Sequence, residues 1–261
     1  MNKTELSHME TNYTKDAPCK KPLVVAHRGG GLLAPENTIA AFKNAIKLGV
    51  DRIELDVQLS KDNVVVVIHD EKINRTTNGK GRISDMTYAE MAVYDTGCKF
   101  SEKYRGEHIP VLEEVLELVN GKCTLLIEVK NQENMYKGLE KKIADLISRY
   151  NAKSWCVVQS FEYESLYSLH KIDHEITLGL LMADARPGRP NYNNINISFI
   201  SEININQRFA NQKSIDFLHG LNKKTFIWTV NKCKRMQHLI RYGVDGIITD
   251  NPAMLQELMR L

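Results

Sequence analysis

The stretch RIELDV at residues 52–57 alternates charged and apolar side chains, which is the period-two pattern of a β-strand. Side chains point to opposite faces of a strand in turn, so Glu54 and Asp56 share one face and the apolar residues between them share the other. A similar run, TLLIEV at residues 124–129, brings in Glu128 near its end. These two strands, with helical patterns between successive strands, predict a parallel sheet built from βα units.

Further β-rich runs of this kind lie on both sides of RIELDV, and eight of them are expected to form barrel strands. They occupy residues 23–27, 52–57, 124–129, 154–159, 176–181, 197–200, 224–229 and 246–249. Helical patterns fall at residues 37–48, 111–119, 134–150, 162–169, 210–220, 232–240 and 252–261, while residues 182–196 are rich in Pro, Asn and Gly and favour a helix least. Eight βα units in 261 residues predict an α/β fold, the (β/α)8 TIM barrel.

The second strand is followed by a feature that a simple barrel lacks. Residues 64–68 form another β-rich run after only the turn-like residues 60–63, which is too short for a parallel crossover of about a dozen residues. We therefore expect an antiparallel arm that opens a small insertion after strand 2, at about residues 60–110. Long insertions of barrels lie on the side where active sites form. The expected organisation is a polar N-terminal arm at residues 1–20 and one barrel domain at residues 21–261.

Composition excludes several classes of protein. The 35 basic and 32 acidic residues are interspersed and give a net charge of +3, so no nucleic-acid-binding surface is expected. The five cysteines are widely spaced and form no CxxC pair, which argues against a disulfide framework and a zinc site. No apolar run is long enough for a signal peptide or an integral membrane segment. We expect a cytoplasmic protein as the chain stands, or a periplasmic or secreted one if a leader has been removed.

The three carboxylates Glu54, Asp56 and Glu128 are expected to converge at the carboxyl end of the barrel strands. Like charges in an apolar barrel are costly unless a cation or a proton compensates them. Oxygen ligands without His or Cys favour a hard cation, so the pattern indicates one divalent cation, Mg²⁺ or Ca²⁺. A structural ion-pair cluster with Lys130 is the alternative.

Two histidines end β-rich runs near these carboxylates. His27 ends the first strand and is followed by Arg28 and three glycines, a loop in which the backbone can approach a ligand and the guanidinium can bind phosphate. His69 ends the antiparallel arm. Two such histidines beside a cation could move protons onto a leaving oxygen and off an attacking one. Trp228, near the end of the seventh strand, could fill the core or flank a substrate's carbon skeleton.

Taken in order, these motifs resemble the glycerophosphodiester phosphodiesterase family. The matching stretches are HRG at 27–29, PENT at 35–38, ELDV at 54–57, HD at 69–70, RTT at 75–77, IP at 109–110, LEEV at 112–115, EVK at 128–130, QSF at 159–161, WTVN at 228–231 and GIITDNP at 246–252. The resemblance covers residues 22–260.

The resemblance implies a TIM barrel with a small insertion and metal-dependent hydrolysis of glycerophosphodiesters, such as glycerophosphocholine or glycerophosphoethanolamine, to sn-glycerol 3-phosphate and an alcohol. Carried over residue by residue, it implies Glu54, Asp56 and Glu128 as metal ligands, His27 and His69 as general acid and base, Arg28 and Lys130 on the phosphate, Trp228 beside the glycerol, and Glu36 and Asp70 orienting Arg28 and His69. We hypothesise a cyclic phosphate intermediate, formed by the substrate's own 2-hydroxyl.

Two other functions fit parts of this pattern. A lysophospholipase D acting on lysolipids would need an apolar approach over the insertion, for which Met86, Met91, Tyr94, Phe100 and Tyr104 are candidates, although they fit a core of the insertion better. A non-catalytic barrel that binds a phosphorylated metabolite would lack a catalytic residue, and none is missing. Residues 182–196 match no motif, so the recognition of the alcohol group stays open.

Overall fold

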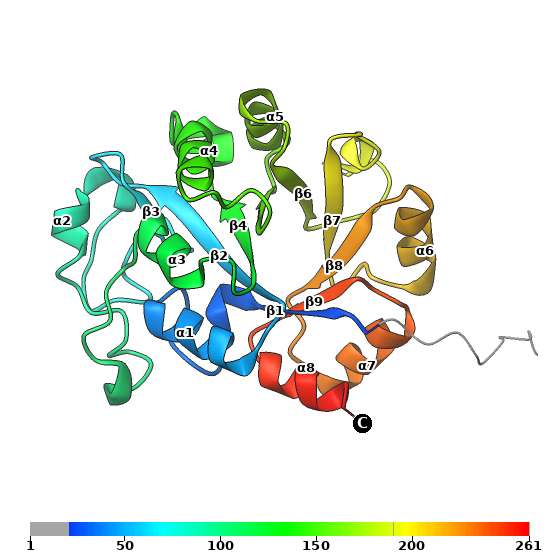
Figure 1. Ribbon diagram of the computed structural model, residues 1–261, viewed down its shortest axis with the longest axis horizontal. Coiled ribbons are helices and arrows are strands. Elements are labelled where there is room, and N and C mark those ends of the chain that lie inside the picture. Colours follow the sequence, from blue (N-terminus) through cyan, green and yellow to red (C-terminus); the bar gives the residue numbers. More distant parts are fainter. Residues whose placement is uncertain (1–20, 190, 261) are drawn as a thin grey trace, which may run out of the picture.

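Eight parallel strands close into a barrel that helices surround, in a computed structural model that describes residues 21–189 and 191–260 (Figure 1). The strands are β1 (Leu23–Ala26), β2 (Arg52–Leu59), β4 (Thr124–Val129), β5 (Cys156–Ser160), β6 (Thr177–Met182), β7 (Ile200–Asn206), β8 (Lys224–Trp228) and β9 (Gly246–Thr249). Each strand pairs with the next in the order β1-β9-β8-β7-β6-β5-β4-β2, and pairing of β1 with β2 closes the ring. The predicted TIM barrel is confirmed.

The helices fall close to the predicted ranges. They are α1 (Ile39–Leu48), α3 (Leu112–Val119), α4 (Leu139–Arg149), α5 (Tyr163–Ile172), α6 (Gln212–Gly220), α7 (Cys233–Arg241) and α8 (Pro252–Leu258). Between β6 and β7 the described residues contain only the 3-10 turn Tyr192–Asn194, in agreement with the weak helical pattern there. None of the helices that the structure describes is long and apolar enough to span a membrane.

Two predicted elements depart most from the structure. The strand expected at residues 197–200 begins only at Ile200 and runs to Asn206, because isoleucines alternate there with buried Glu202 and Asn204, whose polarity hides the strand. The helix expected from residue 134 begins at Leu139. The residues before it form the 3-10 turn Gln132–Asn134, in which Glu133 and Asn134 have positive φ angles of 53° and 56° and interrupt the helical path.

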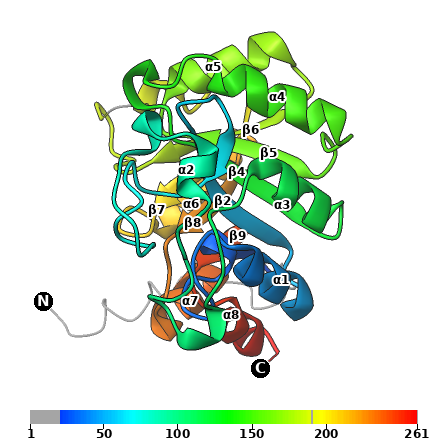
Figure 2. The same cartoon turned by 90° about the vertical axis from the view of Figure 1, so that its left-hand side faces the viewer.

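The insertion has an antiparallel strand and a small core of its own. Strand β3 (Val65–Val67) pairs antiparallel with β2, as predicted. Figure 2 shows the loops of the insertion and the short helix α2 (Tyr88–Met91), which the sequence did not predict, on the side of the barrel that faces the viewer. The insertion's core contains Val66, Ile68, Ile73, Ile83, Met91 and Ile109, with Met86 and Tyr94 packed against it. Of the five residues considered for a lipid approach, Met86, Met91 and Tyr94 therefore pack in the core of the insertion.

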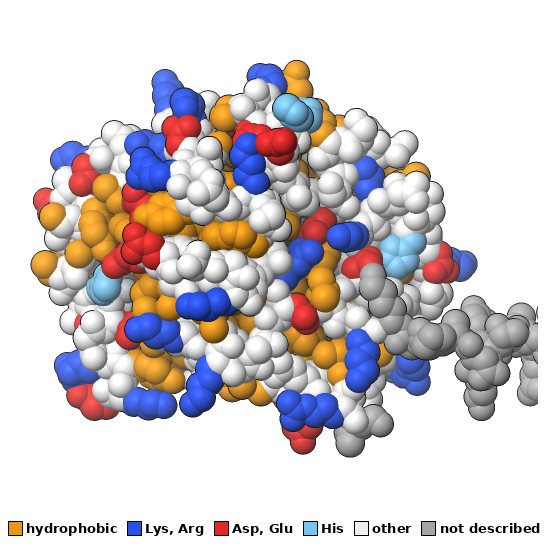
Figure 3. Space-filling view, viewed as in Figure 1, with side chains coloured by type: hydrophobic (Ala, Val, Ile, Leu, Met, Phe, Trp, Pro, Cys, Tyr) orange, Lys and Arg blue, Asp and Glu red, His pale blue; other side chains and the backbone are white. Residues whose placement is uncertain are grey.

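The surface agrees with the composition. Basic and acidic side chains are interspersed on the face shown in Figure 3. Within the described part of the chain, Cys98, Cys123, Cys156 and Cys233 are free thiols. The fifth cysteine, Cys19, and the predicted polar arm at residues 1–20 lie outside the described residues.

Alternate residues of β2 point into the barrel, and the deepest of them forms a buried ion pair. Arg52 donates two hydrogen bonds to Glu202 of β7, with N–O distances of 2.9 and 3.0 Å. Its guanidinium also lies over the ring of Phe226, 4.3 Å from the centroid. Both partners of the pair are buried, so removal of one would leave the other charge without compensation.

We therefore expect Arg52→Met to lower the free energy of unfolding by about 3–5 kcal/mol, because it leaves the Glu202 carboxylate buried in the barrel without a counter-charge. The double variant Arg52→Met/Glu202→Leu should recover most of this loss. Urea unfolding followed by circular dichroism measures both. A single variant that costs less than about 1 kcal/mol would show that the pair is not closed off from water.

Candidate active site

The three predicted carboxylates meet at the carboxyl end of the barrel. Parallel register pairs Asp56 of β2 directly with Glu128 of β4, and Glu54 lies two residues earlier on the same face of β2. One carboxylate oxygen from each residue lies within 4.8 Å of the others. All three side chains are buried. The period-two pattern thus produces the cluster that the sequence indicated.

Burial and mutual repulsion disturb the protonation of this cluster. Burial, with the neighbouring charge of Asp56, raises the pKa of Glu54 to about 8. Burial also raises the pKa of Glu128. Burial opposes ionisation of Asp56 as well, but the positive charges of Lys130 and Arg28 outweigh it and lower the Asp56 pKa. The site's own cations therefore compensate the Asp56 carboxylate but not three ionised carboxylates together.

The donor set fits a divalent cation. Asp56 Oδ1 and Glu128 Oε1 are buried, and the Lys130 ammonium, 3.1 Å from Asp56 Oδ1, forms ion pairs with both. Glu54 Oε2 accepts a hydrogen bond from the backbone N–H of Arg28 at 2.9 Å, while its other oxygen lies 3.5 Å from the Gln159 amide nitrogen. An ion-pair cluster with Lys130 thus leaves Glu54 with neutral donors, and oxygen ligands of this kind suit Mg²⁺ or Ca²⁺.

His27 follows β1 directly and is held between two carboxylates. Its Nδ1 lies 2.6 Å from Asp250 Oδ1, and its Nε2 lies 4.0 Å from Glu54 Oε2. Burial lowers the His27 pKa, but Glu54 and Asp250 outweigh it, so the pKa is raised. Asp250 in turn accepts a hydrogen bond from the Asn231 amide. Asp250 was not among the predicted site residues, although it follows β9 within the matched GIITDNP stretch.

The loop after His27 brings Arg28 into the site at a conformational cost. Arg28 has φ 51° and ψ 33°, a left-handed conformation that is strained for a residue other than glycine. The next residue must be glycine, because a Cβ on Gly29, at φ 83°, would lie 2.7 Å from the Ala41 Cβ. In this conformation Arg28 Nε lies 3.2 Å from Asp56 Oδ2 and Nη1 donates to Glu36 Oε1 at 2.9 Å.

His69 comes from the insertion and faces the same carboxylates. Its Nδ1 lies 2.7 Å from Asp70 Oδ1. Burial and the charges of Lys130 and Arg28 lower its pKa, against the opposing effect of Asp56. The Gln58 amide fixes the backbone around it by donating to the carbonyls of Ile68, His69 and Asp70, at 3.1, 2.9 and 2.8 Å. Gln58 was not predicted, but continuing the alternation of β2 by two residues would have found it.

Arg75 of the insertion connects Glu36 and Asp70. Its guanidinium donates two hydrogen bonds to Glu36, both of 2.8 Å, and two to Asp70, of 2.7 and 3.0 Å. Hydrogen bonds from Arg75, and then from His69, lower the Asp70 pKa to about 2. Glu36 and Asp70 therefore contact Arg28 and His69, the two residues that the resemblance expected them to orient.

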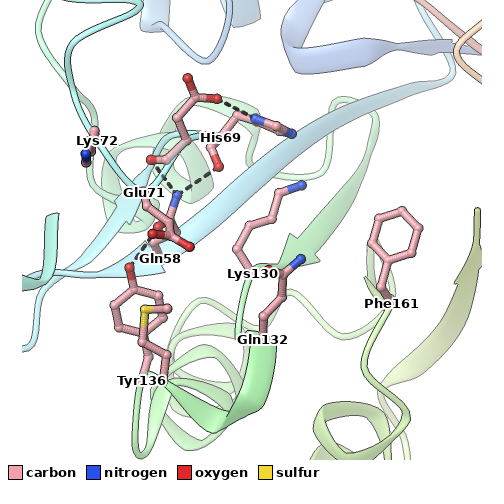
Figure 4. Close-up of a pocket in the computed structure, with 10 residues that line it drawn as sticks. Gln58, His69, Glu71, Lys72, Lys130, Gln132, Tyr136 and Phe161 are labelled. Carbon is pink, nitrogen blue, oxygen red and sulfur yellow. Dashed lines mark hydrogen bonds and ion pairs between the residues drawn. The ribbon is translucent and has the colours of Figure 1, made fainter. Parts of the chain in front are cut away.

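Two adjoining cavities open above the carboxylates. The inner one, of about 140 Å³, is lined by His27, Arg28, Glu54, His69, Glu128, Lys130, Gln159, Phe161, Leu181, Trp228, Thr229 and Ile248. The outer one, of about 590 Å³, shares His69, Lys130 and Phe161 with it and is also lined by Gln58, Asp70, Glu71, Lys72, Gln132, Met135 and Tyr136. Figure 4 shows Lys130 and Gln132 between Phe161 on one side and Gln58 and Tyr136 on the other.

Trp228 lines the inner cavity instead of only filling the core. Its ring packs edge-to-face on Phe161, with centroids 5.5 Å apart, and its Nε1 donates to the Asn204 carbonyl at 2.8 Å. The described residues between 182 and 196 line neither cavity. One of them contacts a residue that lines both cavities, since the Asn191 amide donates to the Phe161 carbonyl at 2.6 Å.

Known proteins are similar to this chain in sequence and in fold. The model of the glycerophosphoryl diester phosphodiesterase family matches residues 27–254. A protein named glycerophosphodiester phosphodiesterase from Caldanaerobacter subterraneus subsp. tengcongensis is 42% identical, with 92% of this chain and 98% of the relative covered. A human lysophospholipase D is 28% identical over 90% of this chain and 85% of its own length. A solved Oleispira antarctica phosphodiesterase, in complex with the product sn-glycerol-3-phosphate, superposes with a TM-score of 0.83 at 27% identity and covers 92% of this chain and 97% of its own.

The electrostatics of the cluster predict that a divalent cation stabilises the fold, because it would compensate three crowded carboxylates. Protein stripped by a chelator should gain about 5–10 °C in Tm when Mg²⁺ or Ca²⁺ is added at about 100 times its Kd, measured by calorimetry. Glu128→Gln should lose this gain. Glu140→Gln changes a buried glutamate outside the cluster and should keep it. An unchanged Tm of the stripped protein with both cations would contradict a cation site here.

Proposed function

The chain belongs to the glycerophosphoryl diester phosphodiesterase family and is an enzyme of that class, and from this premise we propose that it hydrolyses glycerophosphodiesters with a small polar alcohol, such as glycerophosphocholine or glycerophosphoethanolamine. The products are sn-glycerol 3-phosphate and the free alcohol. The observation that carries the proposal is the inner cavity, which His27 and His69 line together with the carboxylates Glu54 and Glu128.

Glu54, Asp56 and Glu128 would hold one divalent cation, Mg²⁺ or Ca²⁺, as their oxygen donors and close spacing suggest. When bound, such a cation polarises a phosphoryl oxygen as a Lewis acid. Arg28 and Lys130 line the same cavity with a guanidinium and an ammonium. Both bind the nonbridging phosphoryl oxygens and stabilise the charge that builds up on them during the reaction.

The two histidines are oriented alike for proton transfer. In each, Nδ1 faces a carboxylate, Asp250 for His27 and Asp70 for His69. A carboxylate partner keeps the proton on Nδ1, so Nε2 is left to accept or donate a proton toward the substrate. Either histidine alone would supply one proton transfer, and the pair supplies both that the displacement requires.

Hydrolysis proceeds in two displacements. One histidine removes the proton of the substrate's glycerol 2-hydroxyl, whose oxygen attacks phosphorus, while the other histidine protonates the departing alcohol oxygen. The phosphorus–alcohol bond breaks and a cyclic phosphate forms. Water then opens the ring with the histidines in exchanged roles, and sn-glycerol 3-phosphate results. Because nucleophile and phosphorus belong to one molecule, the attack needs no second reactant to be positioned.

We assign the two halves of the substrate to the two cavities. The inner cavity of about 140 Å³ has the volume of about five waters, which suits a glycerol unit against Trp228 and Leu181. The outer cavity of about 590 Å³ would receive the alcohol. A lysolipid would carry its acyl chain on the glycerol, where the inner cavity is narrow. The relation to a human lysophospholipase D keeps lysolipids as the alternative to be tested.

Substrate comparison tests this assignment. With Mg²⁺ or Ca²⁺, the stripped enzyme should release sn-glycerol 3-phosphate from glycerophosphocholine and glycerophosphoethanolamine, detected by a coupled dehydrogenase assay. Lysophosphatidylcholine should react slowly. The analogue of glycerophosphocholine without the 2-hydroxyl should react at least about 100-fold more slowly, because the internal nucleophile is gone. An equal rate for this analogue would exclude the cyclic route, and faster turnover of the lysolipid would favour the lysophospholipase D function.

Removal of either proton carrier should abolish most turnover. We expect His27→Ala and His69→Ala each to lower kcat by about 10²- to 10⁴-fold while sn-glycerol 3-phosphate still binds, measured by calorimetric titration. His108→Ala is the matched control, because His108 also contacts a carboxylate, Glu114 at 3.3 Å, but lies outside both cavities. A kcat within threefold of the wild type in either test variant would remove that histidine from the mechanism.

A further inference from the structure

Arg75 lies in the insertion and outside the two cavities, yet it makes four hydrogen bonds to residues around the site. Its Nε and Nη2 donate to the two oxygens of Asp70, and its Nη1 and Nη2 donate to the two oxygens of Glu36. One planar guanidinium thus holds two carboxylates, each with both oxygens. Glu36 belongs to the loop between β1 and α1, whereas Asp70 belongs to the insertion, so Arg75 joins the two parts of the molecule.

Each of these carboxylates contacts a different residue of the inner cavity. Glu36 Oε1 also accepts from Arg28 Nη1 at 2.9 Å. Asp70 Oδ1 also lies 2.7 Å from His69 Nδ1. The oxygens that Arg75 Nη2 binds are therefore the same two that contact Arg28 and His69. A rotation of either carboxylate away from Arg75 would also move it away from its partner in the site.

Stability alone gives little reason for this arrangement. The Arg75 side chain is 47% exposed, and ion pairs at such positions contribute little to folding on average. The geometry nevertheless needs an arginine, because a lysine ammonium cannot donate in two parallel pairs to two carboxylates. The loop is anchored as well, since Lys99 Nζ donates to the carbonyl of Asn74 at 2.5 Å and lies 3.5 Å from that of Arg75.

We propose that Arg75 is a positioning residue for the reaction. It holds Glu36 and Asp70 so that Arg28 and His69 both face the same phosphoryl group. Arg75 thereby orients two residues together. They are His69, the proton carrier that the insertion contributes, and Arg28, the phosphate-binding arginine of the barrel. The inference rests on the proposed function, because it assigns Arg28 and His69 the roles given there. Arg75 itself lines neither cavity, so it acts through Glu36 and Asp70.

The test compares Arg75→Ala and Arg75→Lys with Arg105→Ala. Arg105 is also an exposed arginine of the insertion paired with a glutamate, Glu102, and it lines neither cavity. We expect Arg75→Ala to lower kcat for glycerophosphocholine by about 10- to 100-fold, the usual effect of removing an outer orienting partner. Arg75→Lys should recover only part of the rate, and Arg105→Ala should keep it, with the Tm of all three close to that of the wild type.

A second readout separates positioning from a structural role. Imidazole ¹⁵N NMR should show the neutral His69 ring with its proton on Nδ1 in the wild type and in Arg105→Ala, and a mixture of tautomers in Arg75→Ala. In a double-mutant cycle, Arg75→Ala and Asp70→Asn together should lose less activity than the sum of their separate losses, since both act through one contact.

Equal kcat in Arg75→Ala and Arg105→Ala, or an unchanged His69 tautomer, would overturn the inference. A loss of activity that follows a loss of Tm would also overturn it in favour of a structural role. The NMR signal does not depend on turnover. If the wild type released no sn-glycerol 3-phosphate but the tautomer of His69 still changed in Arg75→Ala, the positioning contact would stand and the proposed reaction would fail.

Discussion

The crowding of three carboxylates at one end of a closed barrel is the constraint around which the rest of the site is arranged. The register of β2 against β4 places Asp56 beside Glu128, and the pleat places Glu54 on the same face. Because all three are buried, water cannot screen their repulsion. Every cationic group in the inner cavity, Lys130 and Arg28 among them, faces this cluster. A closed ring of eight strands keeps the carboxylates from separating, so a divalent cation is the simplest way to complete their compensation.

The barrel and its insertion contribute different parts of the site. The barrel supplies the carboxylates, His27 with its partner Asp250, and the narrow inner cavity. The insertion supplies His69, whose backbone carbonyl accepts a hydrogen bond from the Gln58 amide of β2. It also supplies Asp70, Glu71 and Lys72 to the lining of the outer cavity. Ion pairs across the boundary unite the two parts. The arrangement lets one side of the substrate be enclosed while the other side, where the alcohol departs, stays open to a larger space.

Much of this could be predicted from the sequence wherever one pattern determined one structure. The alternation in RIELDV fixed the face of β2 and therefore the carboxylate cluster, and the short turn after β2 excluded a parallel crossover. Prediction failed where polar residues belong inside the barrel. Glu202 and Asn204 are buried in β7, so its alternation was not apolar and the strand was placed too early. Asp250 and Arg75 were missed for a different reason, because their contacts with His27 and Glu36 join segments far apart in the chain. Gln58 could have been predicted, because it continues the alternation of β2.

The most direct test of this account is to locate a cation by anomalous diffraction from crystals grown with Mn²⁺, which prefers the same oxygen ligands as Mg²⁺ and Ca²⁺. We expect one strong peak within about 2.0–2.6 Å of an oxygen from each of Glu54, Asp56 and Glu128, with the Lys130 ammonium moved away from Asp56 Oδ1. Crystals that show no peak there, and in which Lys130 still lies between the carboxylates, would contradict the account and leave the cluster as an ion-pair network.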